Sequence, residues 1–345
     1  MDPFALRPLG RTSLELPRLG LGGASLGNIF NTIPETQADA TLDAAWDAGV
    51  RFYDTSPWYG RGLSEHRIGR GLYLRPPGEA IVSTKVGRVL FAPDDVAAFE
   101  ASERSWPNGL KFQHRHDYSY AGVMRSYEDS LQRLRRNRVD VLVIHDLDLA
   151  NLGSEELVSQ HLDALDAGGG MRALEELKAA GLIKAIGAGV NRMGTIPRFL
   201  ERFELDFFLV ALPYTLAEQP VLDVEFPLCQ ARGVGVIIGG VFASGILATG
   251  PVPGARYNYA IANEEQLARV GRMQAVCERH GVPLAAAALQ FTLHHPLVAS
   301  VIPGAFHPDH PRRNVESMRV EIPADLWGEL KHEGLLRMDA PTPQT

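Results

Sequence analysis

The chain has 345 residues, of which 45% are hydrophobic and 22% charged, and its formal net charge is −7. This composition excludes a disordered or fibrous protein, and it supplies enough apolar residues for one large buried core. The dispersed acidic charge argues against nucleic acid as a partner, because phosphate binding needs clustered lysine and arginine. No apolar run reaches the ~18 residues of a membrane span, so we expect no membrane partner either.

Only two cysteines occur, Cys229 and Cys277, and they form no CxxC pattern. The N-terminus shows no basic segment followed by an apolar stretch, which would mark a secretory signal. These features predict a cytoplasmic protein in a reducing compartment, without a disulfide framework.

The chain opens with a predicted β-hairpin, in which segments 6–9 and 14–16 flank a turn at Gly10 and Thr12. Eight short apolar segments follow, and their lack of polar alternation predicts strands that are covered on both faces. These predicted strands span residues 19–21, 52–54, 81–85, 139–145, 183–190, 207–211, 234–238 and 299–302.

Amphipathic segments between these strands predict helices. In segment 121–134, for example, Val123, Tyr127, Leu131 and Leu134 recur at helical spacing. The other predicted helices span residues 35–48, 64–72, 171–180, 196–203, 224–232, 264–280, 284–294 and 309–318.

Eight strands that alternate with helices predict a closed (β/α)8 barrel, or TIM barrel, of the α/β class. We expect a single domain over residues 1–345, with an ordered core from about residue 5 to about residue 335. The main alternative is an open doubly wound sheet, which uses the same units. It is disfavoured because no G-x-G-x-x-G follows the first strand.

One connection, residues 86–118, is unusually long and shows no clear periodicity. It follows the third strand and would therefore rise from the C-terminal face, where barrel active sites lie. Loops of this length in compact domains are usually functional, so a substrate lid is predicted. The alternative is a variable surface decoration.

Polar residues stand at the ends of three successive strands, with a tyrosine in one of the loops. Asp54 ends the second strand, Tyr59 follows it, Lys85 ends the third strand and His145 ends the fourth. In a barrel all four meet at one mouth. Taken singly, each has an ordinary structural explanation, such as turn chemistry for Asp54 or loop packing for Tyr59.

Together these residues suit proton transfer. A phenol with a pKa near ~10 is a poor base at neutral pH, so a nearby ammonium is expected to lower that pKa. Asp54 would balance the charge of Lys85, and His145 would orient a substrate oxygen. The set predicts a site beside a carbon that exchanges hydride with a cofactor.

Four segments resemble the aldo-keto reductase family: the opening hairpin 9–22, and residues 52–69, 83–87 and 141–145. The resemblance extends over nearly the whole chain. It implies a (β/α)8 barrel with a nicotinamide cofactor, NAD or NADP, lying across its C-terminal mouth. It also implies Tyr59 as general acid/base, Lys85 as the group that lowers its pKa, Asp54 as the partner of Lys85, and His145 as the group that positions the substrate oxygen.

Segments 117–130 and 144–148 are similar to the D-threo-aldose 1-dehydrogenase branch, which includes L-fucose, L-galactose and pyridoxal 4-dehydrogenases. This resemblance implies oxidation of the hemiacetal hydroxyl at C1 of a small sugar to a lactone, with L-fucose, L-galactose or D-arabinose as expected types. One alternative is an NADPH-dependent aldehyde or ketone reductase. Another is a non-catalytic binding or regulatory subunit, against which the four intact polar residues argue.

The resemblance also implies contacts to the cofactor and the substrate. NADP-preferring members usually carry lysine or arginine where this chain has Gly304 and His310, so NAD is predicted. Gly239 stands where many members have a tyrosine that stacks on nicotinamide, and Phe242 is expected to compensate. The predicted cofactor contacts are Asn191, Gly239, Phe242, Gly304, Phe306, His310 and Asn314; the predicted substrate walls are Trp58, Trp106 and Tyr118. No metal is expected, because the short histidine pairs lack a third ligand.

Overall fold

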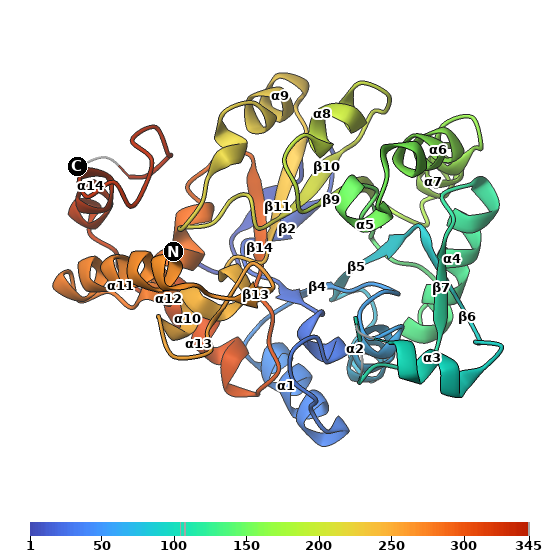
Figure 1. The fold of residues 1–345 in the computed structure, drawn as a ribbon, viewed down its shortest axis with the longest axis horizontal. Helices are drawn as coiled ribbons and strands as arrows, with labels where there is room; N and C mark the ends of the chain where they lie inside the picture. Colours follow the sequence, from blue (N-terminus) through green and yellow to red (C-terminus); the bar gives the residue numbers. More distant parts are fainter. Residues whose placement is uncertain (104, 107, 344–345) are drawn as a thin grey trace.

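Eight parallel strands surround the centre of the molecule in a computed structural model that describes residues 1–103, 105–106 and 108–343. In their hydrogen-bonded order they are β14 (Val298–Ile302), β11 (Gly235–Gly239), β10 (Phe207–Ala211), β9 (Ala185–Val190), β8 (Val141–Ile144), β5 (Ile81–Val86), β4 (Phe52–Asp54) and β3 (Leu21–Gly22). Parallel bridges from Leu19 to Val301 and from Gly22 to Gly304 join the two edges of the sheet (Figure 1). The predicted (β/α)8 barrel is therefore confirmed.

Helices pack around the outside of the barrel. Those predicted from the sequence are α1 (Glu35–Asp47), α2 (Leu63–Tyr73), α4 (Tyr120–Leu134), α7 (Gly170–Ala179), α8 (Thr195–Leu200), α9 (Glu225–Arg232), α11 (Glu264–Arg279), α12 (Leu284–Thr292) and α13 (Asp309–Arg319). In α4 the Ser119 side chain caps the first turn by accepting from the backbone N–H of Gly122, and the apolar stripe faces inward. None of the described helices is long and apolar enough to cross a bilayer.

The sequence did not predict several further helices and turns. They are α5 (Leu149–Leu152), α6 (Glu155–Leu165), α10 (Ile246–Thr249), α14 (Ala324–His332), and the 3-10 turns η1 (Ser25–Gly27), η2 (Pro220–Leu222) and η3 (Ala243–Gly245). The signal for α6 was present, since Ser154 caps it and Val158, Leu162 and Leu165 are buried on one face.

The N-terminal hairpin closes the end of the barrel at which the strands begin. Its strands, β1 (Leu6–Pro8) and β2 (Glu15–Pro17), pair antiparallel, and its leucines pack with side chains inside the barrel such as Phe207. Gly10 at the turn has φ +56°, and a Cβ there would lie 2.4 Å from the carbonyl oxygen of Asp206. Only glycine fits this approach. Because the hairpin fills the N-terminal end, the C-terminal end is the one open to ligands.

The connection between β5 and α4 is not the structureless loop that the sequence predicted. It contains β6 (Arg88–Phe91), α3 (Val96–Ser102) and β7 (Gln113–His116), and β6 pairs antiparallel with β7 beside α4 (Figure 1). The sequence of β7 is Gln-His-Arg-His, so no apolar alternation marked it as a strand. Residues 104 and 107 of this connection lie outside the described residues. A second small hairpin, β12 (Arg256–Tyr257) with β13 (Ala260–Ile261), follows η3 and α10.

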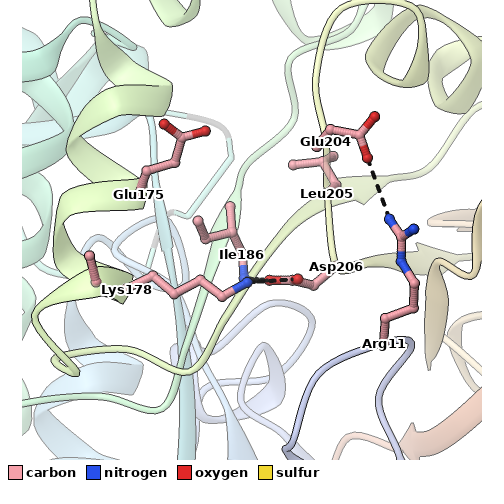
Figure 2. A pocket seen from close by; sticks show the side chains of 8 residues that line it. Arg11, Glu175, Lys178, Ile186, Glu204, Leu205 and Asp206 are labelled. Carbon is pink, nitrogen blue, oxygen red and sulfur yellow. Dashed lines mark hydrogen bonds and ion pairs between the residues drawn. The ribbon is translucent and has the colours of Figure 1, made fainter.

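A polar hollow lies at the N-terminal end of the barrel, beside α7 and the start of β10 (Figure 2). The Lys178 ammonium there is 2.6 Å and 2.7 Å from the two carboxylate oxygens of Asp206, which also accepts from the backbone N–H of Ile186. Arg11 reaches Glu204 at 3.4 Å. Both cations are paired and the hollow faces away from the barrel mouth, so we interpret it as structural.

Candidate active site

A buried ion pair joins β4 and β5 at the C-terminal mouth. Adjacent parallel strands place Asp54 beside Ser83, two residues before Lys85. The Lys85 ammonium donates to the Asp54 carboxylate at 2.7 Å and to the carbonyl oxygen of Thr55 at 2.7 Å. Ser83 donates to the other carboxylate oxygen of Asp54 at 2.9 Å. Burial raises the pKa of Asp54, and the charge of Lys85 opposes that rise.

Tyr59 and His145 meet above this pair. The Lys85 nitrogen lies 4.6 Å from the centre of the Tyr59 ring. The rings of Tyr59 and His145 are 5.8 Å apart, centre to centre, and nearly perpendicular. The structure therefore brings together all four residues that the sequence singled out, although they come from three different βα units.

The pKa of Tyr59 is raised well above its ordinary value of 10, first by desolvation and then by the negative charges of Asp54 and Asp146. This differs from the expectation that Lys85 lowers it. The physical reason is that desolvation of the buried phenol dominates, while Asp54, 2.7 Å from the Lys85 ammonium, offsets part of the positive charge that Lys85 presents to the phenol. The neutral phenol, a proton donor, is the resting form of Tyr59.

The imidazole of His145 is buried and has a polar neighbour at each ring nitrogen. Its Nδ1 is 3.0 Å from the Ser56 hydroxyl, and its Nε2 is 3.3 Å from a carboxylate oxygen of Asp146. Desolvation, with the positive charges of Lys85 and Arg88, lowers the pKa of His145 well below its ordinary value. His145 is therefore a neutral imidazole at neutral pH.

A cleft of about 390 Å³ extends from Asp54 and Tyr59 to α13. Its lining includes six of the seven predicted cofactor contacts: Gly239, Phe242, Gly304, Phe306, His310 and Asn314. The seventh, Asn191, is not among the residues that line it; its amide donates to Asp146 at 3.1 Å. Among the described residues, no group of three or more histidine, cysteine and acidic side chains is arranged to hold a metal ion.

The walls of this cleft suit an elongated, partly aromatic cofactor. Glycines occur along it, and a Cβ added at Gly245 would meet no atom within 4 Å, so the backbone there borders open space. Aromatic rings of Phe30, Phe242 and Tyr259 add flat apolar surface. Within the part of the lining that the structure describes, Arg313 is the one lysine or arginine. A nicotinamide dinucleotide fits this combination of shape and chemistry.

Two of the three predicted substrate walls lie together beside Tyr59. Trp106 packs edge-on against Trp58 at 6.2 Å and lies 6.1 Å from Tyr59, measured between ring centres. Glu103 holds Trp106 in place, because its carboxylate accepts from the backbone N–H of Trp106 at 2.9 Å and pairs with the buried Arg61. The connection after β5 thus carries an aromatic side chain to the catalytic end of the barrel.

Tyr118 lies elsewhere. Its side chain is only 1% exposed, and its hydroxyl donates to the carbonyl oxygen of His145 at 2.6 Å. The expectation that Tyr118 forms a substrate wall is therefore wrong: it packs beneath His145 and supports the backbone there.

Comparison with known proteins places this geometry in a family. The profile of the Aldo/keto reductase family matches residues 18–332. The chain belongs to the aldo-keto reductase family. It is 42% identical to a pyridoxal 4-dehydrogenase from Microbacterium luteolum, over 96% of this chain and 97% of that protein. It is 37% identical to a D-threo-aldose 1-dehydrogenase from a Pseudomonas species, over 96% of each.

Among solved structures, the holo form of an aldo-keto reductase from Bacillus halodurans is similar, with a TM-score of 0.73, 26% identity and 97% coverage of both chains. The predicted family and oxidoreductase class are thus confirmed. Aldo-keto reductases use a nicotinamide cofactor, NAD or NADP.

This aldo-keto reductase also has site residues that the sequence analysis did not select. Arg88, on β6, is buried, donates to Asp146 at 2.9 Å and lies 4.1 Å above the Trp58 ring. Asp146 follows His145 directly, and that adjacency was a visible signal. Tyr259 lines the cleft from the β12–β13 turn, far along the chain from every motif.

Proposed function

We propose that this aldo-keto reductase is an NAD-dependent dehydrogenase that oxidises the hemiacetal hydroxyl at C1 of a cyclic aldose to a lactone. The observation that carries the proposal is the convergence of Tyr59, Lys85 and His145 at the inner end of a cleft suited to a dinucleotide. The 37% identical D-threo-aldose 1-dehydrogenase supports the substrate class. Sugars of the L-fucose, L-galactose and D-arabinose type are the first candidates.

In this mechanism the substrate hydroxyl lies between Tyr59 and His145. Bound nicotinamide supplies the chemistry of hydride acceptance from C1. Tyr59, in its phenolate form, takes the hydroxyl proton as the C1–O double bond forms, and His145 donates a hydrogen bond to the same oxygen. The Asp54–Lys85 pair fixes the floor of the site and keeps the ammonium close to the phenol without leaving a buried charge unbalanced.

Pyridoxal is a second candidate substrate. Trp58 and Trp106 form an edge-on aromatic pair near Tyr59, and an aromatic setting suits a pyridine ring better than a sugar ring, which offers mainly hydroxyl groups. The 42% identical pyridoxal 4-dehydrogenase supports this candidate. Both candidates require oxidation of a hydroxyl-bearing carbon at the same site.

Initial-rate assays test the proposal. L-fucose, L-galactose, D-arabinose and pyridoxal are each supplied with NAD and with NADP, and small aldehydes are supplied with NADPH. The proposal expects reduced cofactor and a lactone product in at least one of the first set, with higher kcat/KM for NAD. Turnover only with aldehydes and NADPH would contradict it in favour of a reductase, and no hydride transfer in any assay would favour a binding role.

The preference for NAD depends on Asp309 and Arg313, and it yields a prediction. Asp309 lies 3.9 Å from Arg313, the cation that lines the α13 end of the cleft, so its negative charge would oppose an extra phosphate bound by Arg313. We expect Asp309→Asn to raise kcat/KM for NADP about two- to threefold relative to NAD, because an exposed carboxylate no longer competes for Arg313. Adding Arg313→Ala should abolish the gain; an unchanged cofactor ratio in Asp309→Asn would remove this pair from cofactor selection.

A further inference from the structure

The ring of His145 has a polar neighbour at each nitrogen: a hydrogen-bonding hydroxyl at Nδ1 and a nearby carboxylate at Nε2. The Ser56 hydroxyl lies 3.0 Å from Nδ1, and a carboxylate oxygen of Asp146 lies 3.3 Å from Nε2. A neutral imidazole carries one proton, on one of its two nitrogens. Which nitrogen bears it decides whether the ring donates to a substrate oxygen or accepts from it.

The partners of Ser56 determine the state of Nδ1. The Ser56 oxygen accepts a hydrogen bond from the backbone N–H of Trp58 at 3.0 Å, and this donor cannot reverse its role. Within the described part of the chain, the ring of His145 is the other partner of this hydroxyl, whose residue is fully buried. A buried hydroxyl proton needs an acceptor, so Ser56 donates to Nδ1, which must then be unprotonated.

The surroundings of Asp146 lead to the same assignment. Arg88 donates to one oxygen of the Asp146 carboxylate at 2.9 Å, and Asn191 donates to the other at 3.1 Å. A carboxylate only accepts, so a lone pair on Nε2 would face a negative oxygen, whereas an N–H there is attracted to it.

The backbone of Asp146 has φ +50°, a left-handed conformation that is unfavourable for a residue other than glycine. The contacts with Arg88 and Asn191 hold it in this position. The carboxylate is therefore fixed beside the ring rather than free to turn away.

We propose that Ser56 and Asp146 are positioning residues that hold His145 as the neutral tautomer with its proton on Nε2, so that the ring donates a hydrogen bond to the substrate oxygen. This inference rests on the proposed function, in which His145 and Tyr59 share that oxygen. The opposite tautomer would present a lone pair from Nε2 and compete with Tyr59 for the hydroxyl proton. Ser56 and Asp146 thereby keep the two roles separate: Tyr59 exchanges the proton, and His145 orients the oxygen.

The direct test is long-range ¹H–¹⁵N NMR of the full chain labelled at histidine, with the His145 signals assigned by their loss in His145→Gln. The expected wild-type spectrum has a protonated Nε2 and an unprotonated Nδ1. Ser56→Ala should shift both nitrogens toward a mixture of tautomers, and Ser56→Thr should restore the wild-type pattern. Asp146→Asn should shift the signals in the same direction as Ser56→Ala, because the neutral amide no longer repels a lone pair.

Kinetics give the second readout. Ser56→Ala should lower kcat roughly tenfold while KM for the cofactor stays within twofold, and Ser56→Thr should recover most of the loss. Ser126→Ala is the matched control, since Ser126 is a buried serine of α4 whose hydroxyl has no partner among the described residues. A wild-type ring protonated on Nδ1, or a spectrum and kcat unchanged in Ser56→Ala, would overturn the inference. Absence of turnover by the wild-type protein would instead refute the proposed function, and the NMR spectrum alone would then test the tautomer of His145.

Discussion

Replacement of Tyr59 by phenylalanine is expected to lower kcat by about 10²- to 10⁴-fold, the usual contribution of a positioned acid or base. The ring would keep its packing against Trp106 and His145, with centres 6.1 Å and 5.8 Å away, so the site should keep its shape. Only the proton-transferring oxygen is lost. Binding of the cofactor, measured by fluorescence titration, should therefore change little.

The pH dependence of this activity follows from the raised pKa of Tyr59. In the oxidising direction the phenolate is the base, and its fraction grows tenfold per pH unit below the pKa, so kcat should rise with pH through the neutral range. In the reducing direction the neutral phenol is the donor, and kcat should be flat there. The rise with pH in the oxidising direction should be lost in the phenylalanine variant.

Tyr120→Phe is the matched control for Tyr59→Phe, because Tyr120 is a tyrosine of α4 whose hydroxyl contacts Glu176 outside the barrel mouth. It should retain wild-type kcat. If Tyr59→Phe retained it too, Tyr59 would have no part in proton transfer, and the proposed mechanism would fail.

The barrel and its four polar residues were predictable because they depend on short-range patterns. Each strand is a buried apolar run, and closure of the barrel brings every strand end to one face. Asp54, Lys85 and His145 therefore converge regardless of the conformation of the loops. For β4 and β10, the bounds predicted from the apolar runs are the same as those in the structure.

The remaining parts of the site depend on contacts that no local pattern encodes. Tyr118 looked like a pocket aromatic, but its hydroxyl reaches the backbone of His145, 27 positions later in the chain. Ser56 stands in no pattern that predicted a role for it, yet it contacts the ring of His145, 89 positions away. Asp146, whose backbone is left-handed, likewise accepts hydrogen bonds from Arg88 and Asn191, which are distant in sequence.

The largest effect on stability is expected at Lys85. Its side chain and that of Asp54 are 1% and 2% exposed, so Lys85→Met would leave a buried carboxylate without its counter-charge. Removal of one partner of such a pair usually lowers the free energy of unfolding by about 3–5 kcal/mol. Denaturant unfolding should detect this loss, and activity should fall with it because the ammonium next to Tyr59 is gone.

Lys178→Met is a matched control at the opposite end of the barrel. Lys178 also pairs with an aspartate, Asp206, but its side chain is 38% exposed. Because solvent screens that pair, the same substitution should cost under about 1 kcal/mol and leave kcat unchanged. Equal losses of stability in the two variants would mean that burial of the Lys85 pair has no special consequence.

The double variant Asp54→Asn with Lys85→Met separates stability from chemistry. It removes both buried charges, so most of the lost stability should return, while kcat should stay low because the phenol still lacks its ammonium neighbour.

The pH dependence of stability gives an independent check on the Lys85→Met variant. Burial already raises the pKa of Asp54, and loss of Lys85 would raise it further, so the folded state of Lys85→Met should bind a proton that the unfolded state releases. The stability deficit of the single variant should therefore shrink as pH falls from 8 to 5, and that pH dependence should disappear in the double variant. A deficit that stayed constant with pH would show that the unpaired carboxylate is not its cause.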